Sequence, residues 1–219
     1  MYMRVTHGMM QNNTKVIGLT GTTGSGKSTA AMILKNRGAY VIDADKVAHE
    51  IIRKGKEAYN EIIEDFGDGI LGDDGEIERK KLAAIVFTNK EKLEKLNSIT
   101  HKIIVKRIED EVNTKKAENY EFIVIDAPLL IQTGLHKCCD SIWGIYADEE
   151  TRTERIIKRD NISREKALER IRNQKGFQET IDKYANCIIN NGNGASYDME
   201  VFIEHELNCM RENPNGFSD

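Results

Sequence analysis

The sequence predicts an α/β fold, a doubly wound parallel sheet of five strands with helices on both faces. The chain opens with a short apolar run, an amphipathic segment and a second apolar run, which is the pattern of strand, helix and strand. Three more strand patterns follow residue 117, separated by helical patterns. The block between the two groups has helical periodicity, so we interpret it as an insertion.

The first part of the predicted nucleotide-binding core is residues 15–44. Lys15–Leu19 (KVIGL) is a short apolar run that ends in a cluster of Gly, Thr and Ser, so we expect a buried strand. Apolar residues recur at helical spacing over Lys27–Arg37, and Gly38 supplies a helix stop. Tyr40–Asp43 is the second strand. Parallel strands joined by helices bind ligands beyond their carboxyl ends, so we expect the site at that rim.

Residues 45–116 form the predicted helical insertion, which we expect to bind the substrate. IERKKLAAIVF and LEKLNSITHKIIVKRIEDEV both carry apolar residues three and four positions apart. FGDGILGDDGE, a stretch rich in Gly and Asp, is expected to form a turn that interrupts these helices. The charged residues of the block are expected to lie on solvated helix faces.

The second part of the core is residues 117–204. Its predicted strands are Tyr120–Asp126, Ser141–Tyr146 and Cys187–Asn190. An arginine-rich helical lid is expected at about residues 149–178, interrupted near Asn161 with Ser163 as an N-cap. Asn-Gly pairs then mark a turn, and MEVFIEHEL predicts a final amphipathic helix.

Composition excludes several classes of protein. A net charge of −4 without a basic block argues against nucleic acid as a partner. No apolar run approaches the ~20 residues of a membrane span, and the N-terminal segment has no apolar signal core. The 4 cysteines form no CxxC pair, so we expect reduced thiols in a cytoplasmic protein. We expect residues 1–14 to be a disordered extension and residues 205–219 a tail.

The strongest motif is GTTGSGKS, Gly21–Ser28, which we call the phosphate loop. It matches G-x-x-x-x-G-K-[ST] between a predicted strand and a predicted helix. Its glycines let backbone N–H groups converge on phosphate oxygens, Lys27 can reach the outer phosphates, and Ser28 can bind Mg²⁺. The candidate nucleotide-binding residues here are Gly21, Gly24, Ser25, Gly26, Lys27, Ser28 and Thr29.

The loop predicts a nucleoside triphosphate, and other features narrow the class. Asn89–Lys92, the nearest match to the guanine-recognising Asn-Lys-x-Asp motif, ends in lysine, which argues against a GTPase. Chain length, a single phosphate loop and an arginine-rich helix favour a small-molecule kinase. A kinase for another acceptor, such as a nucleoside, and a non-catalytic nucleotide-binding regulator are the alternatives.

Three aspartates lie at the expected rim of the sheet. Asp43 ends a strand and Asp45 begins a helix in VIDADKVAHE. Asp45 could simply cap this helix, which would explain one aspartate but not the pair. A carboxylate beside the phosphate loop can instead accept the proton of an attacking hydroxyl. We predict that Asp45 is the catalytic base and that Asp43 supports Mg²⁺ or has a structural role. Asp126, at the end of YEFIVID, is a candidate Mg²⁺ ligand through water, or a turn cap.

Several segments, in this order, resemble the dephospho-coenzyme A kinases: GLTGTTGSGKST, GAYVIDADKVAH, DGEIERKKLAAIVF, LEKLNSITH, VIDAPLL and ERIIKRD…ERIRNQ. The resemblance runs from about Lys15 to Asn191. It implies phosphorylation of the 3′-hydroxyl of the dephospho-coenzyme A ribose with ATP and Mg²⁺, the last step of coenzyme A synthesis. It also implies a P-loop kinase core with a helical coenzyme A-binding insertion and a lid, acting as a monomer or weak homo-oligomer.

The resemblance implies roles for individual residues. Arg155 and Arg159, four apart on one helix face, would meet ATP phosphates, with Arg155 joining Asp45 and Lys27 in catalysis; a solvated basic face is the alternative. Arg170 is a weaker candidate of the same kind. Asn190 follows the last strand, where such kinases contact adenine. The implied acceptor-binding residues are Asp45, His49, His101, Pro128 and Leu129.

Overall fold

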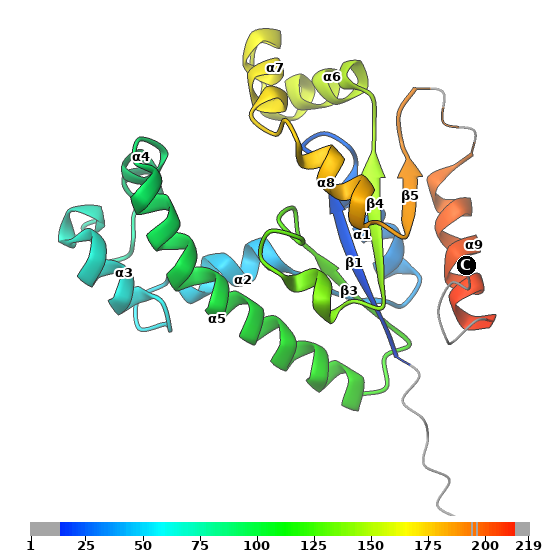
Figure 1. Ribbon diagram of the computed structural model, residues 1–219, viewed down its shortest axis with the longest axis horizontal. Helices are drawn as coiled ribbons and strands as arrows, with labels where there is room; N and C mark the ends of the chain where they lie inside the picture. The colour runs from blue at the N-terminus through cyan, green and yellow to red at the C-terminus, as the bar shows by residue number, and fades with distance from the viewer. Residues whose placement is uncertain (1–13, 194, 196, 213–219) are drawn as a thin grey trace, which may run out of the picture.

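The computed structural model describes residues 14–193, 195 and 197–212 (Figure 1). In the described residues, five strands form one sheet in the order β2-β3-β1-β4-β5, and each neighbouring pair is parallel. The predicted α/β class with five parallel strands is confirmed. The strands are β1 (Lys15–Gly21), β2 (Tyr40–Asp43), β3 (Phe122–Asp126), β4 (Ser141–Tyr146) and β5 (Cys187–Asn190).

Two helices, α1 (Lys27–Asn36) and α9 (Met199–Glu212), cover one face of the sheet. Alternate strand residues such as Leu19, Val124 and Trp143 point to this face, where they are buried with side chains of both helices. The period of two along a strand explains this division, because successive side chains point to opposite faces. The helices α1 and α9 thereby form one layer of the fold.

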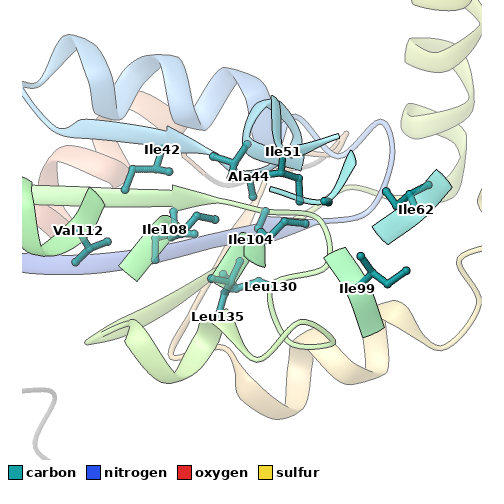
Figure 2. Close-up of a cluster of buried hydrophobic side chains, with 14 of the residues drawn as sticks. Ile42, Ala44, Ile51, Ile62, Ile99, Ile104, Ile108, Val112, Leu130 and Leu135 are labelled. Carbon is teal, nitrogen blue, oxygen red and sulfur yellow. The ribbon is translucent and has the colours of Figure 1, made fainter. Parts of the chain in front are cut away.

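The other face carries the long helix α5 (Lys90–Ala117) and α8 (Phe177–Tyr184). The buried residues of α5 are Ile99, Ile104, Ile108 and Val112. In Figure 2 they follow one another across the cluster, with strand residue Ile42 on one side and Leu130 and Leu135, which follow β3, on the other. The same cluster extends into the insertion through Ile51 and Ile62. Sheet and insertion therefore share one continuous hydrophobic core, with α5 as the element that joins them.

The insertion is helical, as predicted. Its elements before α5 are α2 (Ala44–Ile51), α3 (Tyr59–Phe66), the 3₁₀ turn η1 (Asp68–Ile70) and α4 (Arg79–Phe87). The stretch rich in Gly and Asp forms the expected turn, closed by an isolated antiparallel bridge between Leu71 and Ile77. Helices α3 and α4 lie at the far side of the molecule from α9 (Figure 1).

Helices α6 (Glu149–Asp160) and α7 (Arg164–Arg172) form the segment expected to be a lid. Both lie beyond the carboxyl ends of the strands (Figure 1). Asn161, with φ of 49°, ends α6 in the left-handed conformation that asparagine tolerates. Ser163 caps α7 by accepting a hydrogen bond from the N–H of Lys166 at 3.4 Å, so the predicted interruption and cap are confirmed.

Several boundaries differ from the prediction: β1 continues to Gly21, α1 ends at Asn36, and two larger differences have a clear cause. The third strand starts at Phe122, not Tyr120, because the Tyr120 N–H donates to the carbonyl of Lys115 and completes the end of α5. The last helix continues to Glu212, so residues 205–212 are helix, where a tail was expected. Burial of Leu207 and Met210 against the sheet explains this extension. Residues 1–13 and 213–219 lie outside the described part.

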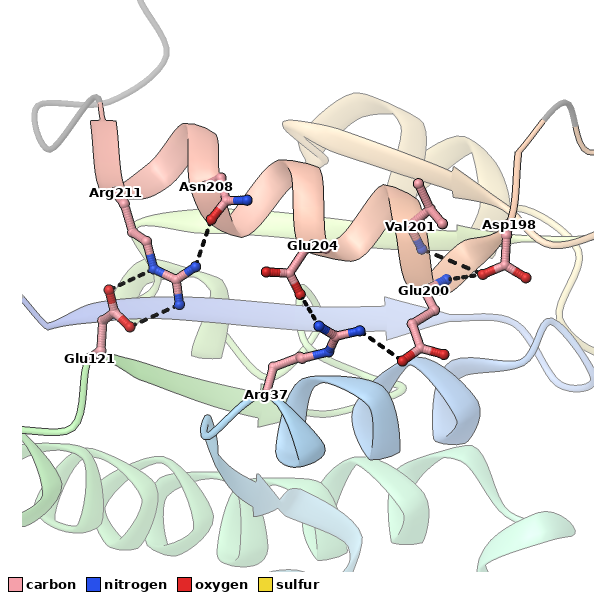
Figure 3. Close-up of polar contacts among 8 residues, drawn as sticks. All are labelled: Arg37, Glu121, Asp198, Glu200, Val201, Glu204, Asn208 and Arg211. Carbon is pink, nitrogen blue, oxygen red and sulfur yellow. Dashed lines mark hydrogen bonds and ion pairs between the residues drawn. The ribbon is translucent and has the colours of Figure 1, made fainter.

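Ion pairs fasten α9 along its exposed side (Figure 3). Arg37, after α1, binds Glu200 and Glu204, which lie one turn apart on α9. Arg211 makes a paired contact with Glu121 at 2.8 and 3.0 Å. These side chains are partly exposed, so solvent screens the pairs and apolar burial is what holds the helix.

Two further observations concern the chain as a whole. No helix in the described ranges combines the length and apolar character that a membrane crossing requires. All cysteines, Cys138, Cys139, Cys187 and Cys209, are free thiols. Burial raises the pKa of Cys187 and Cys139 to about 12, so these thiols stay protonated and unreactive at neutral pH.

We expect Ile108→Ala to lower the free energy of unfolding by about 2–5 kcal/mol, because Ile108 is fully buried where α5 meets the sheet. Urea denaturation followed by circular dichroism measures this change. Lys106→Ala, two residues away on the exposed side of α5, is the control and should change stability by less than about 1 kcal/mol. Equal effects of the two substitutions would contradict the shared core.

Candidate active site

A cavity of about 500 Å³ lies at the carboxyl ends of the strands, between the phosphate loop and α6. Its walls combine backbone of the loop with cationic and acidic side chains, so it is suited to an anionic ligand. The residues that line it are Gly21, Thr22, Thr23, Gly24, Gly26, Lys27, Ser28, Asp45, Pro128, Arg155, Arg159 and Gln174. Most of the predicted nucleotide-binding and catalytic residues therefore meet in one place.

The phosphate loop leaves β1 and ends at the first turn of α1. Gly24 and Gly26 have φ of 78° and 102°, a conformation that side chains with a Cβ rarely adopt. Gly26 occupies the N-cap position without a side-chain cap, so the positive end of the α1 dipole is open toward the cavity. Ser25 is buried, and exposed Thr29 is not among the lining residues.

Lys27 forms an ion pair with Asp126, and both side chains are largely buried. Burial raises the pKa of Asp126, Lys27 opposes this rise, and the nearby carboxylates of Asp43 and Asp45 add to it. Three carboxylates thus share the rim of the sheet with two ammonium groups, those of Lys27 and of Lys46, whose Nζ lies 3.4 Å from Asp43 Oδ2. The excess of negative charge would favour a bound cation there.

The two aspartates of VIDADKVAHE have different surroundings. Asp43 is the N-cap of α2, since its carboxylate accepts a hydrogen bond from the Lys46 N–H at 3.0 Å. The cap therefore belongs to Asp43, and not to Asp45 as one alternative had it. Asp45 lies in the first turn of α2, is exposed and lines the cavity. Its carboxylate is available for chemistry.

The arginines of α6 are held in two ways. Arg155 donates from Nη1 to the carbonyls of Gly24 and Ser25, both at 3.3 Å, so it grips the phosphate loop. Arg159 lines the cavity but makes a paired contact with Asp160, at 2.7 and 2.9 Å. Arg170 of α7 also binds Asp160. The pKa of Asp160 is lowered to about 2, mainly by the hydrogen bond from Arg159.

Three residues at this site were missed by sequence analysis. Arg152 donates from Nε to the Thr23 carbonyl at 2.9 Å, and Gln174 accepts from the Thr23 N–H at 2.8 Å. Asn191 donates from Nδ2 to the Ser25 carbonyl at 2.7 Å. The only signal in the sequence was position, since each lies close to a predicted site residue. Backbone contacts of this kind leave no motif.

Other predicted residues lie elsewhere. Asn190 is outside the cavity lining: its N–H donates to the Tyr197 hydroxyl at 3.1 Å, and its side chain accepts from the Gly192 N–H at 3.0 Å. These bonds shape the turn after β5. Pro128 lines the cavity, whereas Leu129 is 40% exposed and does not.

A second cavity, of about 230 Å³, lies in the insertion between α2, α4 and α5. Its lining is mostly apolar, with His49, Arg79, Asn97 and Thr100 as the polar members. His49 lies one helical turn after Asp45 on α2, so the two cavities adjoin the same helix. His101 is not in this lining; it is partly buried on α5, and burial lowers its pKa.

Comparisons with known proteins agree with this geometry. The family model for dephospho-CoA kinase matches residues 15–196. A dephospho-CoA kinase from Carboxydothermus hydrogenoformans is 43% identical over 188 residues, covering 86% of this chain and 91% of that protein. One from Aquifex aeolicus is 44% identical over 177 residues, covering 81% and 88%.

Solved structures that align with this chain include a dephospho-CoA kinase. Dephospho-CoA kinase from Campylobacter jejuni aligns with a TM-score of 0.63 and 30% identity, covering 91% of this chain and 96% of that one. The structure of TT1252 from Thermus thermophilus aligns with a TM-score of 0.74 and 28% identity, covering 92% and 98%. With the phosphate loop, the rim aspartates and the basic helix in place, this chain belongs to the dephospho-CoA kinase family.

Proposed function

We propose that this chain transfers the γ-phosphoryl group of ATP to the 3′-hydroxyl of the dephospho-coenzyme A ribose, with Asp45 as the general base. The observation that carries the proposal is the position of Asp45: its exposed carboxylate lines the same cavity as Lys27 and the phosphate loop. A base must lie within reach of the hydroxyl proton in the phosphoryl-transfer complex. Family membership supports the choice of acceptor.

Nucleotide binding would change the partner of Lys27. Its ammonium group is paired with Asp126 in this structure, and the β- and γ-phosphates of ATP would compete for it. Arg155 and Arg159 line the same cavity and would add positive charge around the moving phosphoryl group. Arg159 would have to leave Asp160 to do so.

Mg²⁺ is the cation that this family's reaction implies, and the donor set of the rim fits it. Ser28 lines the cavity, and Asp126, outside that lining and paired with Lys27, would offer its carboxylate once Lys27 turns to the phosphates. Both supply oxygen ligands, which Mg²⁺ prefers, and the nearby carboxylates add negative charge. In the described part of the chain, no cluster of three or more metal-binding side chains is preformed, so phosphate oxygens and water would complete the shell. Asp43 would act from its cap position as a supporting charge. Bound Mg²⁺ would neutralise charge on the outer phosphates.

The insertion would hold the part of the acceptor that does not react. Its cavity of about 230 Å³ is mostly apolar and adjoins α2, which carries Asp45. Binding energy from such a remote part of a substrate can position the reacting hydroxyl. His49 and Arg79, the basic groups in this lining, would contact the polar portions of the acceptor. We assign His101 a supporting place behind this cavity, next to Thr100.

We also propose that the protein works in the cytoplasm. Its free thiols suit a reducing compartment, and cytosolic ATP would be at hand.

Asp45→Asn should lower kcat by about 10²–10⁴-fold, because an amide cannot accept the hydroxyl proton. A coupled assay of ADP release with dephospho-coenzyme A measures the loss. ATP affinity, measured by calorimetry, should stay within about threefold since Asp45 is not a phosphate ligand. Asp110→Asn on the exposed side of α5 is the matched control. A near-normal kcat for Asp45→Asn would rule out the base, and turnover of a nucleoside in place of dephospho-coenzyme A would rule out the acceptor.

Lys27→Ala should weaken ATP binding by about tenfold or more and lower kcat as well, because it removes a cation from the phosphates. Lys35→Ala, on the exposed last turn of α1, should leave both quantities unchanged. Calorimetry with ATP and the same coupled assay provide the two values. Tight ATP binding by Lys27→Ala would contradict the assignment of the phosphate site.

His49→Ala should raise KM for dephospho-coenzyme A by about 3–30-fold while KM for ATP is unchanged, because His49 lines only the insertion cavity. Initial-rate kinetics with each substrate varied in turn separate the two constants. His205→Ala on α9 is the control histidine. An equal rise in both KM values would place His49 outside the acceptor site.

A further inference from the structure

The carbonyl groups of the phosphate loop accept hydrogen bonds from residues far away in sequence. The Thr23 carbonyl accepts from Arg152 Nε at 2.9 Å. The Ser25 carbonyl accepts from Asn191 Nδ2 at 2.7 Å and, at the longer distance of 3.3 Å, from Arg155 Nη1. Arg152 lies on α6 and Asn191 directly follows β5. Neither residue lines the cavity, whereas the loop residues Thr23, Gly24 and Gly26 do. The two donors therefore support the loop from its outer side.

Because a peptide bond is planar, a donor that fixes its carbonyl also fixes the direction of the N–H group in the same peptide. No peptide bond in the described residues is cis, so each carbonyl and the N–H of the next residue point in opposite directions. The Thr23 carbonyl shares its peptide with the Gly24 N–H, and the Ser25 carbonyl shares its peptide with the Gly26 N–H. Because Arg152 and Asn191 lie outside the cavity lining, carbonyls directed at them would turn these N–H groups toward the cavity, as an anion-binding nest requires.

The supports pack so closely that they also demand glycine. A Cβ on Gly24 would lie 2.9 Å from the backbone oxygen of Arg152, and one on Gly26 would lie 2.0 Å from Asn191 Nδ2. Asn191 is itself fixed, because its N–H donates to the Tyr146 carbonyl at 2.7 Å and its carbonyl accepts from Arg155 at 2.8 Å. Asn191 is therefore held in place beside the phosphate loop.

Arg152 contributes charge as well as a hydrogen bond. Its guanidinium is partly buried, and its Nη2 has no hydrogen-bond partner within the described part of the chain. Burying an incompletely paired cation opposes folding. The same positive charge, held against the loop, favours a polyphosphate in the cavity.

We propose that Arg152 and Asn191 are positioning residues, which preform the anion cradle of the phosphate loop by holding the Thr23 and Ser25 carbonyls outward. They would act on ATP through the loop and not by contact with the acceptor. The inference rests on ATP being the nucleotide of the proposed function.

Asn191→Ala and Arg152→Ala test the inference, with Asn208→Ala on α9 and Arg164→Ala on α7 as matched controls on the exposed surface. Calorimetry measures Kd for ATP, inorganic tripolyphosphate and dephospho-coenzyme A. We expect each test variant to weaken ATP and tripolyphosphate binding by about tenfold, which is the effect of one well-placed hydrogen bond, and to leave dephospho-coenzyme A binding unchanged. KM for ATP should rise in parallel while kcat at saturating ATP changes less than about threefold. Arg152→Lys, which keeps a charged donor, should recover part of the ATP affinity.

Unchanged ATP and tripolyphosphate affinities in both variants would overturn the inference, and so would an equal loss of affinity for dephospho-coenzyme A, since that indicates general distortion. If Asn191→Ala does not fold, Arg152→Ala decides by the same criterion because it holds a different carbonyl. A wild-type protein that binds ATP but does not phosphorylate dephospho-coenzyme A would contradict the proposed function alone. ATP binding tests the anion cradle and turnover of dephospho-coenzyme A tests the proposed function, so the two failures are distinguishable.

Discussion

The parallel pairing of β1 with β3 and β4 is the constraint on which the site depends. In this register Leu19 lies opposite Asp126, Asp126 lies opposite Asp43, and Gly21 lies opposite Ile145. The carboxyl ends of these strands therefore coincide at one rim, where the phosphate loop leaves the sheet. Because β2 and β3 lie on one side of β1 while β4 and β5 lie on the other, this rim is also the topological switch point at which such sheets bind ligands.

The second constraint is the compensation of buried charge at this rim. Asp126 is mostly buried, and an ion pair with Lys27 compensates its charge. A bound polyphosphate would pair with Lys27 in place of Asp126. The freed Asp126 carboxylate would then be available to a cation, so its negative charge would again be compensated.

Helices α5 and α6 contact different parts of the site. Helix α5 continues the hydrophobic core of the sheet into the insertion, which fixes the insertion cavity relative to Asp45. Helix α6 approaches from the other side, and its arginines contact the backbone of the phosphate loop. A loop rich in glycine has little structure of its own, because glycine has wide conformational freedom. Its shape is therefore imposed by its neighbours.

Sequence alone determined the five strands, the helical insertion, the phosphate loop and the aspartates near it, because apolar periodicity and glycine spacing are local properties of the chain. It also placed Ser163 as a cap, since that bond spans only three residues. The cap of α2 is equally local, but the sequence offered two aspartates that favour this position, and the structure shows that Asp43 takes it. Only the tertiary structure decided that Asn190 bonds within its own turn while Asn191 reaches the phosphate loop. It alone revealed Arg152 and Gln174 as partners of Thr23. These contacts join segments more than a hundred residues apart through backbone groups, which every residue carries, so no pattern in the sequence marks them.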